Sequence, residues 1–275
     1  MGSVKSGYAE VNDAKLYYKM AGEGETIVLV HGFTLNLTMW DDQFKEFSQY
    51  YKVIRYDVRG FGNSSTPIEG KPYSHYDDLK SLLDHLGIRE AHIVGLSMGG
   101  SIAIGFTLDY PEYVSSLITV DSTLDGFDYS RTFLAWYISL FTIAKEKGVE
   151  AALEAFINGP LFGATMRNPL VGDRMRQMVR AYSGWRFLHD DPEIEPVPSL
   201  HIRLHEINCP TLAIVGEYDL PNLHSIADKI DEKVPNSKKL IIPGVGHMSN
   251  MEDSESFNRE TLSYLESLGH ERMCV

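Results

Sequence analysis

A turn between an apolar strand and a helix is predicted at residues 95–99, which read GLSMG. An apolar run precedes this pentapeptide, and a stretch of small residues follows it. Glycine two positions before and after the central residue lets strand and helix approach closely and leaves that residue in a strained bend. We expect Ser97 to present an exposed hydroxyl there, beside the Met98 N–H and the positive end of the helix. Ser97 is therefore a candidate nucleophile.

Two further turns follow predicted strands earlier in the chain. One reads HGFT at residues 31–34, and the other reads DVRGFGNS at residues 57–64. The first can supply the Phe33 N–H as a second donor to an oxyanion, the partner of the Met98 N–H. His31 is expected to pack beneath this turn instead of transferring protons. The second lacks the third glycine and the lysine of a phosphate-binding loop, so we interpret it as a structural turn.

These motifs, taken in order, are typical of one superfamily. HGF at residues 31–33, DVRGFGNS at residues 57–64 and GLSMGG at residues 95–100 together resemble the α/β-hydrolase superfamily. Residues 39–97 are most similar to its branch of serine carboxylesterases, enol-lactonases and carbon–carbon bond hydrolases. The resemblance covers nearly the whole chain. It implies an α/β-hydrolase fold, with a mostly parallel eight-stranded sheet flanked by helices and a helical lid inserted after strand 6.

Two downstream strands end where the resemblance places the acid and the base of a catalytic triad. One ends in EYD at residues 217–219, and the next ends in PGVGH at residues 243–247. A serine hydroxyl needs a base, and the base needs a carboxylate that orients it. The resemblance therefore implies that His247 accepts the proton of Ser97 and that Asp219 orients His247.

Two other carboxylates are alternatives for the acid. Asp121 follows a predicted strand and occupies an acid position that part of the superfamily uses, and Glu217 lies two residues before Asp219. Asp219 is favoured because it takes the position that the resemblance gives to the acid. Asp121 is the second choice and Glu217 the third.

The chain between Asp121 and Thr211 is almost ninety residues long, which is too much for a crossover between parallel strands. We expect a helical lid at residues 124–206, with residues 1–123 and 207–275 forming the hydrolase core. An acidic, proline-containing stretch near the end of the insertion is interpreted as a stiff return linker.

Aromatic residues are concentrated in this insertion. Its first apolar helical face has the spacing i, i+3, i+4, i+7, i+8 and comprises Phe133, Trp136, Tyr137, Leu140 and Phe141. Most of the apolar residues should form the lid's own core, and some should line a pocket. We expect Trp136, Phe141 and Trp185 to roof the pocket over Ser97 and to admit a neutral, hydrophobic acyl or alcohol group.

The charge balance narrows the class of partner. The chain carries 25 Lys and Arg residues against 38 Asp and Glu residues, a formal net charge of −13. Nucleic acids and anionic membranes are bound by basic patches, so we expect neither as a partner. The expected partner is a small-molecule ester or lactone. His201 and His205 are four residues apart, but the spacing suggests no third ligand. We predict no metal site and no cofactor.

Cysteine usage and apolar runs indicate a location. Cys209 precedes a predicted buried strand and Cys274 lies near the end of the chain, so we expect no structural disulfide. No stretch approaches the roughly 18 uninterrupted apolar residues of a membrane span. Residues 1–6 lack the apolar core of a secretion signal. We therefore expect a cytoplasmic protein.

The predicted triad implies acyl transfer in two steps. Ser97 would attack a carbonyl, and water would then release the acid from the acyl-enzyme. Cleavage of small to medium hydrophobic carboxylic esters is the first hypothesis, because this reaction requires the fewest specific features of the pocket. Lactone hydrolysis, carbon–carbon bond cleavage of a diketone and perhydrolysis use the same machinery and are alternatives, and a hydroxynitrile-lyase-like activity is a more distant one. A ligand receptor with slow or no turnover is an alternative from another class.

Overall fold

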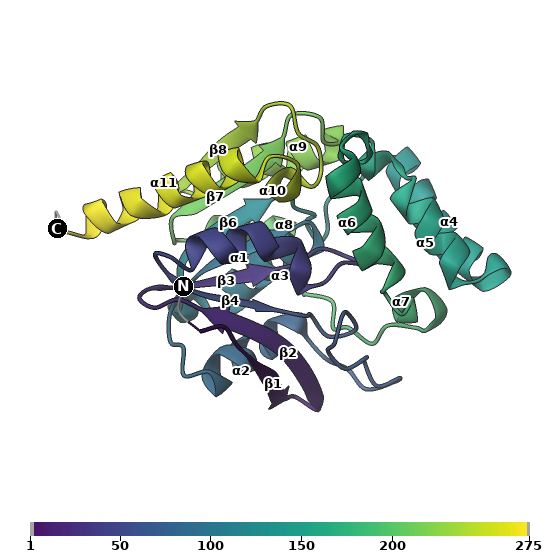
Figure 1. The fold of residues 1–275 in the computed structure, drawn as a ribbon, viewed down its shortest axis with the longest axis horizontal. Coiled ribbons are helices and arrows are strands. Elements are labelled where there is room, and N and C mark those ends of the chain that lie inside the picture. Colours follow the sequence, from purple (N-terminus) through teal and green to yellow (C-terminus); the bar gives the residue numbers. More distant parts are fainter. Residues whose placement is uncertain (1–2, 274–275) are drawn as a thin grey trace.

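Eight strands form one sheet in the computed structural model, which describes residues 3–273 (Figure 1). They are β1 (Lys5–Val11), β2 (Ala14–Ala21), β3 (Thr26–Val30), β4 (Lys52–Tyr56), β5 (Ala91–Leu96), β6 (Val114–Val120), β7 (Thr211–Gly216) and β8 (Ser237–Ile242). Their order across the sheet is β1-β2-β4-β3-β5-β6-β7-β8. β2 pairs with β1 and β4 in the antiparallel sense, and the other neighbours are parallel. The predicted α/β-hydrolase fold, with its mostly parallel eight-stranded sheet, is confirmed.

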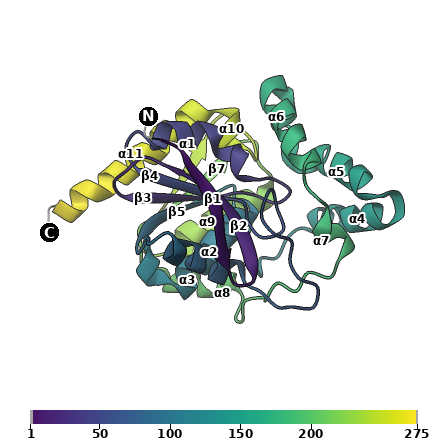
Figure 2. The ribbon, with the colours of Figure 1, turned by 60° about the horizontal axis from the view of Figure 1, so that its bottom comes forward.

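Helices cover both faces of the sheet (Figure 2). α1 (Asp41–Phe47) and α11 (Ser254–Met273) lie on one face, and α2 (His75–His85) and α3 (Met98–Asp109) lie on the other. α9 (Pro221–Lys233) packs against β7 and β8. The central strands β3, β5 and β6 are buried along their whole lengths, because helical layers enclose them from both sides.

Five α-helices lie between β6 and β7. They are α4 (Arg131–Lys147), α5 (Val149–Ile157), α6 (Pro169–Arg180), α7 (Trp185–Leu188) and α8 (Leu200–Arg203). α4 to α7 lie together beyond one end of the sheet, at the right of Figure 1. α8 instead packs against α3, where Arg203 pairs with Asp109 at 2.8 Å. The predicted insertion at residues 124–206 therefore includes one helix that lies on the core.

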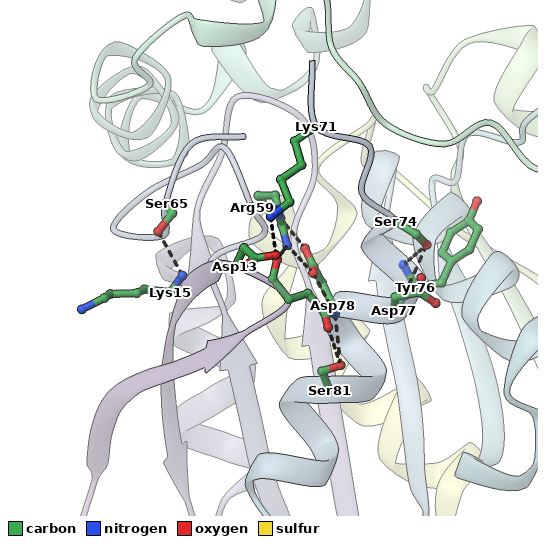
Figure 3. A network of polar contacts seen from close by, with 11 residues as sticks. Asp13, Lys15, Arg59, Ser65, Lys71, Ser74, Tyr76, Asp77, Asp78 and Ser81 are labelled. Atoms are coloured by element: carbon green, nitrogen blue, oxygen red, sulfur yellow. Dashed lines mark hydrogen bonds and ion pairs between the residues drawn. The ribbon is translucent and has the colours of Figure 1, made fainter. Parts of the chain in front are cut away.

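The turn after β4 is tied to the first hairpin and to α2. Arg59 donates hydrogen bonds to both carboxylate oxygens of Asp78, at 2.7 and 2.6 Å, and to the backbone carbonyl of Asn12 at 2.7 Å (Figure 3). Asn12 and Asp13 have φ values of 46° and 62°, as the two-residue turn of a tight hairpin requires. Arg59 and Asp78 are almost fully buried, and breaking such a pair leaves an uncompensated charge. This network therefore holds the beginning of α2 against the hairpin.

Candidate active site

Ser97 lies between β5 and α3 with a strained backbone. Its φ of 55° and ψ of −117° are rarely adopted by a residue with a side chain. A Cβ atom added to Gly95 would lie 2.1 Å from the carbonyl oxygen of Gly99, and one added to Gly99 would lie 2.2 Å from that of Val30. Glycine is therefore required at both positions. Ser97 is only 8% exposed, because its side chain opens onto a cavity. The sequence had predicted a hydroxyl exposed at the surface of the turn.

Hydrogen bonds connect Ser97 to an imidazole and a carboxylate. The Nε2 atom of His247 lies 3.0 Å from the Ser97 Oγ atom, and its Nδ1 atom lies 2.9 Å from a carboxylate oxygen of Asp219. The other oxygen of Asp219 accepts a hydrogen bond from the Leu220 N–H at 2.7 Å. With the ring proton on Nδ1, Nε2 can accept the hydroxyl proton of Ser97. His247 and Asp219 are buried, 2% and 7% exposed, so bulk water does not compete for these bonds.

The two alternative acids bind elsewhere. Asp121 is fully buried and accepts hydrogen bonds from the Gly216 N–H at 2.7 Å and the Ser249 hydroxyl at 2.5 Å. Burial, followed by the charge of Asp219, raises the pKa of Asp121 well above its usual range. Glu217 is exposed and accepts a hydrogen bond from the Gly244 N–H at 2.7 Å. Of the three candidate acids, Asp219 is the one that the structure brings to His247.

The HGF turn lies directly beside Ser97. A Cβ atom added to Gly32 would lie 3.4 Å from that of Ser97. Within residues 3–273, neither the Phe33 N–H nor the Met98 N–H donates a hydrogen bond, so both can serve a ligand. His31 is buried below this turn, with Nδ1 2.8 Å from the Gly32 carbonyl oxygen and Nε2 accepting from the Val58 N–H at 2.9 Å. Both ring nitrogens of His31 are thus used structurally.

A cavity of about 500 Å³ joins the candidate triad to the α4–α7 segment. Ser97, His247, Phe33 and Met98 line it from the sheet side, and Trp136 lines it from α4. The other two predicted pocket residues do not. Phe141 packs edge-on against Tyr137 and Phe187, and Trp185 stacks on His189. The prediction for Phe141 and Trp185 was wrong, because Phe141 packs within the helical segment itself and Trp185 packs on the exposed His189.

The Phe33 ring connects the HGF turn to this segment. It contacts five aromatic rings edge-on, at centroid distances of 5.7 to 6.1 Å: Phe61, Tyr137, Phe156, Tyr182 and Phe187. Four of these rings belong to the segment between β6 and β7. The sequence identified Phe33 by its backbone N–H alone, since nothing in the HGF motif specifies where the ring points.

A charged group on the cavity wall was missed by the sequence interpretation. Arg186 on α7 contacts Asp191 through Nε at 2.6 Å and Glu193 through Nη2 at 2.6 Å. Its Nη1 atom lies 3.9 Å from the Met98 sulfur, next to Ser97. All three charged residues line the cavity. A lone arginine inside an apolar helical stretch, followed by an acidic segment, was the available signal.

The remaining predicted features lie away from the triad. Within residues 3–273, no group of three or more His, Cys, Asp or Glu side chains is placed to hold a metal ion, and His201 and His205 belong to none. Cys209 is a half-buried free thiol, whereas Cys274 lies outside the described residues. In the same part of the chain, every helix is too short or too polar to span a lipid bilayer.

Relatives match most of the chain. Among curated proteins, the "Putative 2-succinyl-6-hydroxy-2,4-cyclohexadiene-1-carboxylate synthase" of Bacillus subtilis (strain 168) is 29% identical over 266 residues, which cover 91% of this chain and 95% of the relative. The "2-hydroxy-6-oxononadienedioate/2-hydroxy-6-oxononatrienedioate hydrolase" of Comamonas testosteroni is 28% identical over 268 residues, which cover 93% and 92%.

Solved structures and a family model agree with these matches. A thermophilic esterase from Thermogutta terrifontis superposes with a TM-score of 0.83 and 27% identity, over 96% of this chain and 99% of that one. The enol-lactonase from Burkholderia xenovorans LB400 shares the fold, with a TM-score of 0.80 and 23% identity over 94% of this chain and all of that one. A family model described as "alpha/beta hydrolase fold" matches residues 25–254. The chain belongs to the α/β-hydrolase fold family.

Proposed function

We propose that this protein is a serine hydrolase that cleaves carboxylic esters of small to medium hydrophobic substrates through an acyl-enzyme. One observation carries the proposal. Ser97, His247 and Asp219 form a continuous hydrogen-bonded relay, with contacts of 3.0 and 2.9 Å, and its serine end opens onto a cavity. Similarity to an esterase of known structure supports the choice of an ester.

The first step of the proposed reaction is attack by Ser97 on the ester carbonyl. His247 takes the hydroxyl proton as the Ser97 Oγ–carbon bond forms, and Asp219 holds the imidazole in the required tautomer. The tetrahedral oxyanion accepts hydrogen bonds from the Phe33 and Met98 N–H groups. Loss of one such donor costs about 3 kcal/mol of transition-state stabilisation in comparable sites. His247 then protonates the leaving alcohol as the carbon–oxygen bond breaks.

The second step returns the enzyme to its starting state. Water takes the place of the alcohol, and His247 accepts its proton as the water oxygen attacks the acyl carbon. Collapse of the second tetrahedral intermediate releases the carboxylic acid, and His247 returns the proton to Ser97. In this proposal α4 to α7 act as a lid within residues 124–206 and exclude bulk water, with Trp136 in the roof. Substitution of Trp136 therefore tests directly whether it forms part of the roof.

A lactone or carbon–carbon bond hydrolase is the second candidate. Relatives named as dienedioate hydrolases, 28% identical to this chain, favour it. The same Ser97, His247 and Asp219 would serve both reactions, so the identity of the substrate distinguishes the two candidates.

The discriminating experiment is a substrate panel. The purified protein is assayed with p-nitrophenyl acetate and butyrate, simple lactones and vinylogous diketones, alongside Ser97→Ala and the exposed control Ser225→Ala. Ester hydrolysis predicts many turnovers on the p-nitrophenyl esters, lost in Ser97→Ala and retained in Ser225→Ala. A preference for lactones or diketones selects the second candidate. One turnover or none on all substrates contradicts both and favours a ligand receptor.

We also propose that the protein acts in the cytoplasm on small molecules. The free Cys209 thiol is compatible with a reducing compartment. Cell fractionation followed by immunodetection checks this location, and recovery in a secreted fraction would contradict it.

A further inference from the structure

We infer that the cavity selects acyl groups by charge: a wall of Arg186, Asp191 and Glu193 favours uncharged acyl groups and rejects those that carry a carboxylate. We call these three residues the charged wall. The inference rests on the proposed ester hydrolysis at Ser97, and it defines the class of ester that the site takes.

Arg186 is the cationic residue that a substrate carboxylate would be expected to bind. It is the only lysine or arginine among the described residues that line the cavity. Its side chain is 24% exposed, and its guanidinium reaches the Met98 sulfur beside the nucleophile. However, its Nε atom already contacts Asp191 and its Nη2 atom already contacts Glu193, each at 2.6 Å. Two carboxylates therefore occupy the Nε–Nη2 edge, one of the edges through which a guanidinium binds an anion with two hydrogen bonds.

The surrounding charges are negative. Besides Asp191 and Glu193, the cavity is lined by Asp125 and Glu195, so its described lining holds four carboxylate residues and one guanidinium. His75 does not offset them, although its Nε2 atom lies 3.8 Å from Glu193. Burial, followed by the charge of Arg186, lowers the pKa of His75 to about 3, so this ring is neutral at physiological pH. A substrate carboxylate that enters this cavity meets a net negative charge and loses water, and the one guanidinium on the wall is already paired with two carboxylates.

Tyr73 contacts the acidic side of the charged wall through both its side chain and its backbone. The Tyr73 hydroxyl donates to Asp191 at 2.9 Å, and Tyr73 forms an isolated bridge with Glu193. The Ile194 N–H donates a hydrogen bond to the Tyr73 carbonyl oxygen at 2.8 Å. The Tyr73 N–H donates a hydrogen bond to the Pro192 carbonyl oxygen at 3.3 Å. These contacts tie the segment that carries the acidic partners of Arg186 to the residues before α2.

The proposed substrate class differs from those named for two relatives. The Comamonas testosteroni protein is named for dienedioates, and the Bacillus subtilis protein for a carboxylate product. The charged wall favours neutral esters over such anionic substrates, and it therefore argues for the first function candidate over carbon–carbon bond cleavage of acidic diketones.

A pair of esters of equal chain length tests the inference. p-Nitrophenyl hexanoate and the p-nitrophenyl monoester of adipic acid differ at the far end of a six-carbon acyl chain, where the second carries a carboxylate. We expect the wild-type protein to prefer hexanoate by at least about 30-fold in kcat/KM, consistent with close like-charge repulsion in a partly buried site. In Asp191→Asn/Glu193→Gln, Arg186 is released, and this preference should fall by at least about tenfold through a gain on the adipate monoester.

Glu112→Gln/Glu255→Gln removes two exposed carboxylates away from the cavity and should keep the wild-type preference. Glu193→Gln alone, which leaves Asp191 on Arg186, should shift the preference in the same direction by less and serves if the double variant fails to fold. Equal wild-type activity on both esters, or an equal shift in the exposed double variant, overturns the inference. Absence of activity on both esters would instead contradict the proposed ester hydrolysis.

Discussion

Asp219 and Asp121 follow neighbouring strands of the sheet, yet their surroundings give them different roles. Asp219 contacts His247, whereas Asp121 joins the end of β7 to the turn after His247 through Gly216 and Ser249. Burial, followed by the charge of Asp219, raises the pKa of Asp121 and so favours its protonated form. Asparagine has the shape and the donor and acceptor of a protonated aspartic acid. Substitution by asparagine should therefore affect the two positions very differently.

Asp219→Asn should lower kcat by about 10³-fold or more, because the imidazole loses the carboxylate that holds its tautomer. Asp121→Asn should stay within about threefold of wild type, and Asp121→Leu, which cannot bind Gly216 or Ser249, should lose both activity and stability. Steady-state kinetics on p-nitrophenyl butyrate with melting temperatures measures all three. The reverse ranking of the two asparagine variants would make Asp121 the working acid.

At the scale of elements, the roof of the cavity depends on how α4 is oriented. Trp136 reaches the cavity and stacks on Phe156, while Trp185 on α7 stacks on His189 outside it. The two tryptophans therefore form a matched pair, one inside the proposed acyl site and one beyond it.

Trp136→Ala should shift the chain-length preference towards longer acyl groups, because it enlarges the cavity, and Trp185→Ala should not. Measuring kcat/KM for p-nitrophenyl acetate, butyrate, octanoate and decanoate in both variants checks this. An unchanged profile in Trp136→Ala, or the same change in Trp185→Ala, would remove Trp136 from the acyl site.

Sequence patterns predicted some elements of the site and not the directions of their side chains. The GLSMG turn and the strand before Asp219 were predictable, because close backbone approach and burial restrict residue type at those positions. The direction of a side chain on an apolar helix was not predictable, because one periodic pattern describes packing between the inserted helices and packing onto a cavity equally well. Phe141 was misplaced for this reason. The pairing of Arg186 with acids in a linker depends on tertiary contacts that no local pattern encodes.

For the whole molecule, two buried histidines link stability to pH. Burial, the largest cause in each case, lowers the pKa of His31 and lowers that of His75 to about 3. The unfolded chain binds protons at these rings below about pH 6.5, while the folded protein does not until a lower pH. The stability that they contribute is therefore present above about pH 6.5 and is lost as the pH falls.

His75→Gln should remove part of this acid sensitivity. A ring with an unfolded pKa near 6.5 and a folded pKa near 3 contributes a loss of about 2 kcal/mol between pH 7.5 and pH 5. Urea unfolding at both pH values should show a correspondingly smaller loss in His75→Gln and an unchanged loss in His189→Gln, whose histidine is exposed. Equal losses in wild type and His75→Gln would contradict a neutral, buried His75.

The most direct measurement traps the covalent intermediate. Wild-type protein is mixed with p-nitrophenyl butyrate, quenched in acid within the first turnover, digested and analysed by mass spectrometry. We expect a butyryl group on the peptide that contains Ser97, fragmentation that places it on this serine, and no label in Ser97→Ala. Steady turnover of the ester with no acyl group on Ser97, or with undiminished activity in Ser97→Ala, would contradict nucleophilic catalysis by this residue.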